Sequence, residues 1–205
     1  EEAKREATQI DHRRKVENAE RDRQLNLARF QEQEKILLNI LPAQIAEQII
    51  SGTGKIIQRF DSATVLFADV VGFTKWSEGL SLDEVAETLN HIFNLFDELA
   101  NEYGVEKIKT IGDAYMCVAG LPEPCDDHAE RMAKMALAMN QKIAESYPSG
   151  EIKLRIGIHC GEVIAGVIGK NKYAYDLWGD TLNTASRIES HGAENKIQVS
   201  EEFTN

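Results

Sequence analysis

The first 40 residues form a long polar segment that contains neither glycine nor proline. Glutamate, lysine, arginine, glutamine and alanine dominate it, and these residues favour a helix. Its apolar residues follow a seam of alternating four- and three-residue steps, which Glu20, Arg23 and Glu34 interrupt. The seam residues are Val16, Leu27, Phe30, Leu37 and Leu41. This spacing predicts a helix that pairs through a coiled coil, most clearly in its second half, and the alternative is a single solvated helix.

The pattern changes to short apolar runs separated by turns from residue 55 onward. The run ATVLFA at Ala63–Ala68 predicts a buried strand. A helix over 81–103 is predicted from its apolar spacing and from a capping box formed by Ser81 and Glu84. The remaining predicted elements are strands over 105–111 and 114–119 joined by a Gly112-Asp113 hairpin, a helix over 126–147, strands over 152–159 and 162–168 paired around Gly161, a helix over 180–189 and a strand over 196–200.

This order of elements predicts an α+β fold of the ferredoxin-like, βαββαβ type, with helices on one face of the sheet and a long N-terminal helix. Pro42 ends or kinks that helix, and a second short helix over 43–51 stops at the following glycines. We therefore divide the chain into a helical, coiled-coil segment, 1–54, and a globular domain, 55–205.

Composition and charge limit the functional classes. Apolar residues make up 42% of the chain and charged residues 28%, which indicates a globular protein with a core. The net charge is −11, and residues 1–35 are neutral overall, so the acidic excess belongs to the rest of the chain. Binding to nucleic acid is therefore not expected, because phosphates would be repelled. No apolar run is long enough to span a bilayer, and three cysteines without C-x-x-C spacing fit the reducing cytoplasm.

Two aspartates stand at the ends of predicted strands. Asp69 is the first charge after the apolar run, and a glycine-containing turn that opens a helix follows it. Asp113 lies at the tip of the hairpin, and a ferredoxin-like sheet makes these strand ends neighbours. Two carboxylates brought together repel unless a cation lies between them, and Mg²⁺ uses few protein carboxylates alongside substrate phosphate. Taken singly, Asp113 is also an ordinary turn residue and Asp69 an ordinary helix N-cap.

Four motifs in combination are much more specific than either aspartate. They are FADVVGFT (67–74), EKIKTIGDAYMCVAGLP (106–122), LRIGIHCGEVIAGVIG (154–169) and YDLWGDTLNTASRIES (175–190). In this order and spacing they resemble the catalytic domain of the class III nucleotidyl cyclases, and LLNILPAQIAEQI (37–49) resembles the linker that precedes such domains. The resemblance implies a phosphorus–oxygen lyase, an adenylyl cyclase that converts ATP into 3′,5′-cyclic AMP and pyrophosphate. A guanylyl cyclase and a non-catalytic dimerisation or signal-relay module are the alternatives.

The resemblance assigns the two aspartates and the loop after Asp69 to metal and phosphate binding. Asp69 and Asp113 match the family's metal ligands, which implies two Mg²⁺ or Mn²⁺ ions per site. Two such ions about 4 Å apart activate an attacking hydroxyl and neutralise a leaving phosphate. The main-chain amides implied to contact the triphosphate are those of Val70, Val71, Gly72, Phe73 and Thr74.

Lys109 and Asp176 match the positions that read the base. Adenylyl cyclases have lysine and aspartate there, whereas guanylyl cyclases usually have glutamate and cysteine. A lysine donates to N1 of adenine and a carboxylate accepts from the N6 amine, whereas guanine presents the reverse pattern. The pair therefore predicts ATP as substrate. Without the four motifs, Lys109 would be interpreted as a surface lysine and Asp176 as a loop carboxylate.

Three more residues match the family's catalytic and phosphate-binding positions. Asn183 and Arg187 are four residues apart and share one helix face, where the family's pair orients the ribose and neutralises charge on the α-phosphate. Arg155 matches an arginine that helps to hold the triphosphate. A solvated edge position is the ordinary interpretation of that arginine.

The family builds each site across a two-fold interface. One subunit supplies the metal ligands, and the other supplies the residues that read the base and stabilise the transition state. Because this chain carries both sets, the resemblance implies a symmetric homodimer with two complete sites. A parallel helix seam agrees with such a dimer and could relay a signal from an upstream sensor or membrane domain. The family usually continues beyond the position of Asn205 with further strands and a triphosphate-binding lysine. We therefore expect the chain to be a piece of a longer protein. In that protein, a sensor or membrane domain would precede a cyclase domain that lies in the cytoplasm.

Overall fold

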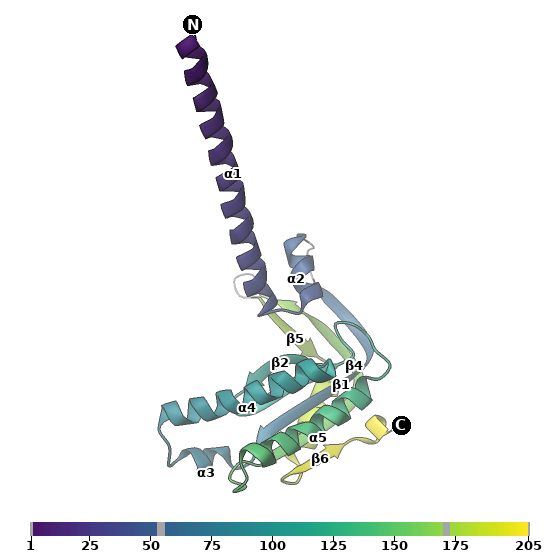
Figure 1. The fold of residues 1–205 in the computed structure, drawn as a ribbon. Helices are drawn as coiled ribbons and strands as arrows, with labels where there is room; N and C mark the ends of the chain where they lie inside the picture. The colour runs from purple at the N-terminus through teal and green to yellow at the C-terminus, as the bar shows by residue number, and fades with distance from the viewer. Residues whose placement is uncertain (1, 53–55, 170–172, 205) are drawn as a thin grey trace. The chain divides into compact units, whose positions relative to one another are not determined.

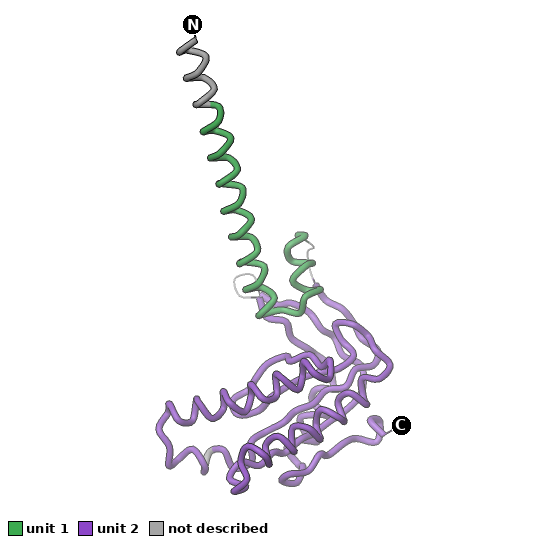
Figure 2. The backbone as a smooth tube through the Cα atoms, viewed as in Figure 1, with its two compact units in different colours: residues 1–53 green, residues 54–205 purple. Residues whose placement is uncertain are grey.

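A computed structural model describes residues 2–52, 56–169 and 173–204. The chain divides into two compact units, residues 1–53 and residues 54–205 (Figure 2). The first unit consists of helix α1 (Glu2–Leu38) and helix α2 (Ala43–Ile50), with Pro42 at the N-cap of α2. The predicted long helix and its end near Pro42 are thus confirmed. None of the described helices is long and apolar enough to cross a bilayer.

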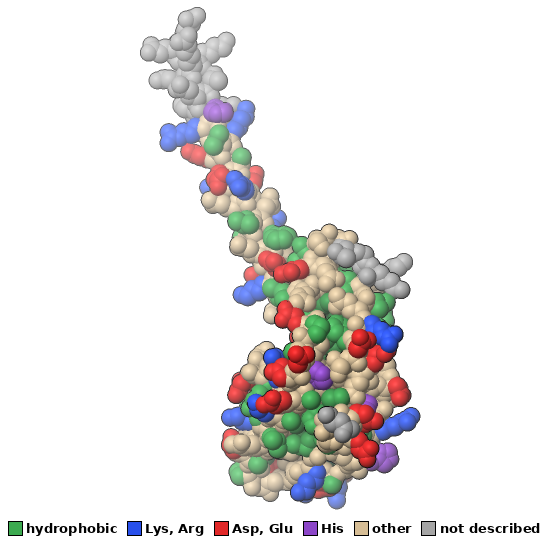
Figure 3. Space-filling model, turned by 90° about the vertical axis from the view of Figure 1, so that its right-hand side faces the viewer, with side chains coloured by type: hydrophobic (Ala, Val, Ile, Leu, Met, Phe, Trp, Pro, Cys, Tyr) green, Lys and Arg blue, Asp and Glu red, His purple; other side chains and the backbone are tan. Residues whose placement is uncertain are grey.

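Helix α1 presents a mixed surface from residue 12 onward. Charged side chains of both signs alternate with isolated apolar ones along its length (Figure 3). The seam residues Val16, Leu27 and Phe30 are 55%, 57% and 50% exposed, so they are available to a partner helix. Leu41 was predicted to continue this seam, and that prediction is wrong. The helix ends before it, and Leu41 is only 3% exposed in the turn toward α2.

The second unit is built around a six-stranded sheet, along which two long helices run (Figure 1). Its strand order is β2-β3-β1-β4-β5, with β6 added parallel to β4, and all other pairings are antiparallel. This arrangement confirms the predicted α+β class. The strands are β1 (Ile57–Val70), β2 (Glu106–Ile111), β3 (Ala114–Ala119), β4 (Leu154–Ile168), β5 (Ala174–Trp178) and β6 (Lys196–Val199).

Two long helices cover one face of the sheet and enclose the core. They are α4 (Leu82–Tyr103) and α5 (His128–Ser146), which pack against each other (Figure 1). The predicted capping box starts α4, since Ser81 Oγ accepts from the Glu84 amide and the Glu84 carboxylate accepts from the Ser81 amide. Gly104, at φ 64°, ends the helix in the left-handed conformation that favours glycine. The run Ala63–Ala68 is fully buried, as predicted for a core strand.

Helix α6 (Asp180–Ser190) lies on the opposite face, so the prediction of helices on one face only is wrong. Leu154, Ile156 and Ile158 join the core under α4 and α5, whereas Gly157 between them meets the backbone of α6. Alternate residues of a strand point to opposite faces, which places α6 across the sheet from α4 and α5.

The predicted strand pair around Gly161 is also wrong, because β4 runs through this glycine without a turn. Gly161 is required for close packing instead, since a Cβ there would lie 2.6 Å from Thr181 Oγ1 of α6. The antiparallel partner of the end of β4 is β5, a strand that the hydrophobic pattern did not predict. Two further short helices, α3 (Phe73–Ser77) and α7 (Glu201–Thr204), complete the unit.

Candidate active site

Asp69 and Asp113 meet at one end of the central strands. Asp69 is the penultimate residue of β1 and pairs across the sheet with Ala114 of β3 and Arg155 of β4. Asp113 lies in the tight turn before Ala114, where Gly112 adopts φ 62°. The sequence prediction that these two carboxylates are neighbours therefore agrees with the register of the sheet.

The environment of Asp69 disfavours a lone negative charge. Burial, together with the negative charges of Asp113 and Glu189, raises the pKa of its carboxyl to about 6, while Arg155 opposes the shift. A divalent cation would offset this repulsion, and two carboxylates are a hard-oxygen donor set that suits Mg²⁺ or Mn²⁺. Among the described residues, no group of three or more His, Cys, Asp or Glu side chains is placed to hold a metal.

The loop after Asp69 leads directly into α3. Val70 is buried at the end of β1, and Gly72 has φ 68°, which turns the chain into the helix. The Val71 amide donates to the Lys153 carbonyl oxygen at 2.9 Å, so a triphosphate would have to compete for it. The amides at the start of a helix have no acceptor within it, so those of Phe73 and Thr74 have no partner inside α3.

Lys109 and Asp176 form an ion pair between strands that are far apart in the sheet order. Lys109 Nζ lies 2.5 Å from Asp176 Oδ2, although β2 and β5 stand at opposite ends of the strand path. The sheet therefore curls until these two strands approach each other. The Leu177 amide donates to the other Asp176 oxygen at 2.9 Å and fixes the carboxylate. The side chains are 42% and 25% exposed, so a donor and an acceptor are presented side by side to solvent.

Asn183 and Arg187 lie one turn apart on α6, and both are exposed. In the part of the chain that the structure describes, no hydrogen bond or ion pair joins either residue to Asp69 or Asp113. Within one chain, the structure therefore shows no direct bond between these two α6 residues and the carboxylate pair.

Arg155 links Asp69 to a residue that the sequence analysis missed. Arg155 Nη2 donates to Asp69 Oδ2 at 2.9 Å, and Arg155 Nε donates to Glu189 Oε1 at 2.6 Å. Glu189 is only 7% exposed, which is unusual for a glutamate in a polar helix. Gly157, an isolated glycine inside an apolar strand, was the available signal that another backbone approaches closely at this point.

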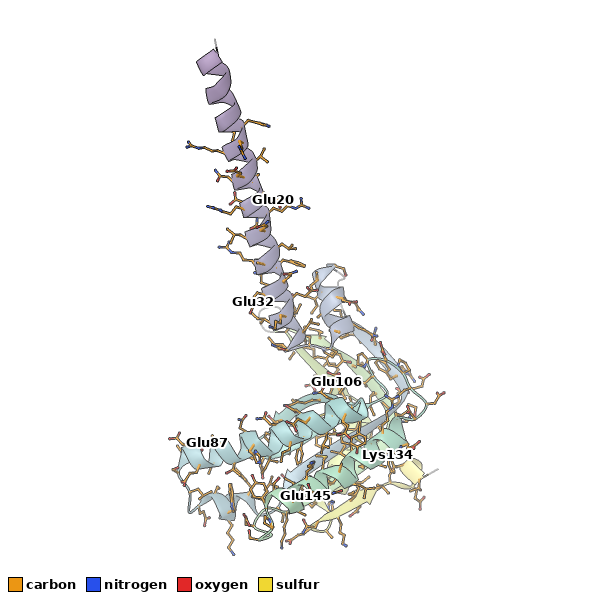
Figure 4. The ribbon with its side chains drawn as sticks, in the orientation of Figure 1. Glu20, Glu32, Glu87, Glu106, Lys134 and Glu145 are labelled. Carbon is orange, nitrogen blue, oxygen red and sulfur yellow. The ribbon has the colours of Figure 1, made fainter. Side chains whose placement is uncertain are left out.

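Glu106, at the start of β2, is a half-buried acid without a predicted role (Figure 4). Burial alone raises the pKa of its carboxyl to about 7. The nearby Tyr175 hydroxyl is buried and has no hydrogen-bond partner among the described residues. The folded protein must therefore carry a poorly solvated charge at this position above neutral pH.

Replacing Glu106 with glutamine is expected to stabilise the protein at high pH only. The folded-state pKa is raised, so wild-type stability falls as pH rises from about 4.5 to about 7 and then levels off. Glu106→Gln should raise the free energy of unfolding by about 1 kcal/mol at pH 8 after allowance for solvent screening, and by nothing near pH 4. Urea unfolding of both proteins at pH 4 and pH 8 measures this difference in the free energy of unfolding. An equal increase at both pH values would contradict the electrostatic explanation.

Comparison with known proteins places the globular unit in one family. Residues 56–205 match the family model described as "Adenylate and Guanylate cyclase catalytic domain". The chain is 42% identical over 172 residues to an adenylate cyclase of Mycobacterium tuberculosis, covering 82% of this chain and 39% of the relative. It is also 42% identical over 180 residues to the receptor-type guanylate cyclase gcy-28 of Caenorhabditis elegans, covering 86% of this chain and 14% of the relative.

A solved structure agrees with both comparisons. It is the catalytic core of a rhodopsin-guanylyl cyclase with converted specificity in complex with ATPαS, with a TM-score of 0.68 and 41% identity over 72% of this chain and 81% of that chain. The chain spans 39% of the Mycobacterium tuberculosis adenylate cyclase and 14% of the Caenorhabditis elegans guanylate cyclase. These two relatives, one named for each nucleotide specificity, are equally similar to it at 42% identity.

Proposed function

Because the chain belongs to the adenylate and guanylate cyclase catalytic domain family, we propose that it is an adenylyl cyclase that converts ATP into 3′,5′-cyclic AMP and pyrophosphate. The choice of base rests on one observation, the juxtaposed Lys109 ammonium and Asp176 carboxylate. Lys109 would donate to N1 of adenine, and Asp176 would accept from its N6 amine. Guanine would place a donor against the ammonium and an acceptor against the carboxylate. Such a mismatch leaves polar groups unpaired and can discriminate by orders of magnitude.

The remaining residues would act on the ribose and the phosphates. Asn183 would orient the ribose so that its 3′-oxygen attacks the α-phosphorus in line with the departing pyrophosphate. Arg187 would neutralise negative charge on the α-phosphate, and Arg155 would hold the triphosphate. Asp69 and Asp113 would hold Mg²⁺ or Mn²⁺, two ions per site, which when bound supply Lewis-acid activation of the hydroxyl and neutralise the leaving group.

We infer further that the active protein is a homodimer. The family resemblance divides each site between two chains, so a second copy would complete the site at Asp69 and Asp113 with its own Lys109, Asp176, Asn183 and Arg187. Helix α1 would pair in parallel and relay a signal from a sensor or membrane domain upstream, with the cyclase unit in the cytoplasm. Since the chain spans 14% and 39% of two relatives, those proteins have ample length for other domains.

Turnover of ATP and GTP with Mg²⁺ or Mn²⁺ tests the proposed specificity. We expect kcat/KM for ATP to exceed that for GTP by about 10²-fold or more. The double variant Lys109→Glu with Asp176→Cys should reverse the preference. Lys107→Glu is the matched control, because Lys107 lies on the same strand but pairs with Asp97 at 2.6 Å. GTP preference in the wild type, or reversal by the control variant, would contradict the assignment.

Breaking the seam of α1 should weaken dimerisation. Leu27 and Phe30 are exposed and lie on the seam, so Leu27→Asp with Phe30→Asp would place two charges in the paired interface. We expect the dissociation constant, measured by analytical ultracentrifugation, to rise about tenfold or more, since burying two unpaired charges exceeds 1.4 kcal/mol. Leu25→Asp is the control, because Leu25 is 54% exposed but off the seam. An unchanged dissociation constant in the Leu27→Asp, Phe30→Asp variant would favour a solvated helix.

A further inference from the structure

Arg155 donates hydrogen bonds to two carboxylates, Glu189 and Asp69, and we distinguish Glu189 as a fixed partner from Asp69 as an exchangeable one, which a ligand can replace. Its Nε donates to Glu189 at 2.6 Å, and its Nη2 donates to Asp69 at 2.9 Å. The guanidinium side chain is 27% exposed, so it stands at the edge of the site. A guanidinium has five N–H donors in a rigid fork, so one edge can stay bonded while another is available to a different acceptor.

Glu189 is the fixed partner because its backbone is locked against the sheet. A Cβ on Gly157 of β4 would lie 2.2 Å from the Glu189 amide nitrogen, so α6 and β4 are in direct backbone contact there. The Glu189 side chain is 9% exposed, and a buried carboxylate is tolerated only where it is paired and hydrogen-bonded. Arg155 supplies that pairing, and Ser190 Oγ adds a longer contact of 3.4 Å.

Asp69 is the exchangeable partner because it belongs to the carboxylate pair proposed to hold the cation. A bound cation would draw on the same Asp69 carboxylate that now accepts from Arg155, so the two would compete for it. When Asp69 turns to a cation, Arg155 loses one acceptor but keeps the other. Its Nη groups are then free for a phosphate, which planar guanidinium groups bind through two parallel hydrogen bonds.

We propose that Glu189 is a positioning residue that holds Arg155 by Nε, so that the Nη edge released from Asp69 remains in place for the triphosphate. This inference rests on the proposed function, since it concerns the same nucleotide site. Without Glu189, the only acceptor left to Arg155 among the described residues would be Asp69, for which it would compete with the cation. Positioning of this kind strengthens binding by ordering a side chain before the ligand arrives.

The test measures binding of inorganic triphosphate with Mg²⁺ by calorimetry, alongside KM and kcat for ATP. Glu189→Ala should weaken triphosphate binding and raise KM about tenfold, the effect of about 1.4 kcal/mol, with kcat changed less than threefold. Glu189→Gln should restore most of the affinity, because its amide oxygen still accepts from Nε. Glu194→Ala is the matched control, since Glu194 is bonded to Lys153 at 3.0 Å rather than to Arg155. In an Arg155→Ala background, Glu189→Ala should have no further effect.

Several results would overturn the inference. One is an undiminished effect of Glu189→Ala in the Arg155→Ala background, and another is a Glu189→Gln variant that melts like wild type yet binds triphosphate as weakly as Glu189→Ala. An active wild type whose Glu189→Ala variant binds triphosphate normally would refute the positioning role while leaving the cyclase assignment intact. Conversely, triphosphate binding that depends on Glu189 in a protein that makes no cyclic nucleotide would refute the proposed function and support the positioning role.

Discussion

Asp69→Asn and Asp113→Asn should each reduce cyclase activity by about 10³-fold, since loss of metal Lewis-acid assistance removes several kcal/mol of transition-state stabilisation. The two carboxylates lie on adjacent strand ends, and burial with mutual repulsion raises the pKa of Asp69 to about 6. Asparagine removes the charge that holds the cation but keeps the shape. The folded state should therefore survive, or even gain stability, while activity with Mg²⁺ is lost.

The matched control for these two variants is Asp83→Asn. Asp83 is an exposed aspartate in the first turn of α4, outside the candidate site. It should keep activity within about twofold, as exposed surface changes usually alter stability by less than 0.5 kcal/mol. Substantial activity in either site variant, with folding confirmed by circular dichroism, would show that the catalytic cation is held elsewhere.

Mixing two inactive variants should restore activity if each site is shared between chains. Asp69→Asn lacks one half of the site, and Arg187→Ala lacks the other. In an equal mixture, half of the dimers are mixed and each has one intact site of two, so the expected recovery is about a quarter of wild-type activity. Rates measured after co-expression or subunit exchange provide the test.

The control mixture combines Asp69→Asn with Asp113→Asn. Both lesions fall in the carboxylate half, so no arrangement of these chains yields an intact site, and activity should remain absent. Recovery in this control would point to an error in the division of the site. No recovery in the first mixture, with mixed dimers demonstrated, would mean that each chain builds its site alone.

Features that depend on neighbouring residues were predictable from the sequence. The capping box at Ser81 set the start of α4, and the Gly112-Asp113 turn placed Asp113 beside the end of β1. The α+β class followed from the order of such elements. The four motifs then assigned candidate roles that geometry alone would not have suggested, above all for the exposed Asn183 and Arg187.

Features that depend on distant packing were not predictable. Gly161 was interpreted as a turn because its real reason, the close approach of Thr181, lies twenty residues away in another element. The pairing of Lys109 with Asp176 requires the sheet to curl, which no local pattern encodes. Glu189 was not singled out, because its burial depends on contact with Gly157 of β4.

The most direct test is a crystal structure of the chain with Mn²⁺ and a non-cyclisable ATP analogue. We expect an anomalous manganese peak shared by the Asp69 and Asp113 carboxylates of one chain, with adenine bonded to Lys109 and Asp176 of a second copy. A manganese peak away from these carboxylates, or a nucleotide whose base contacts neither Lys109 nor Asp176, would contradict the account.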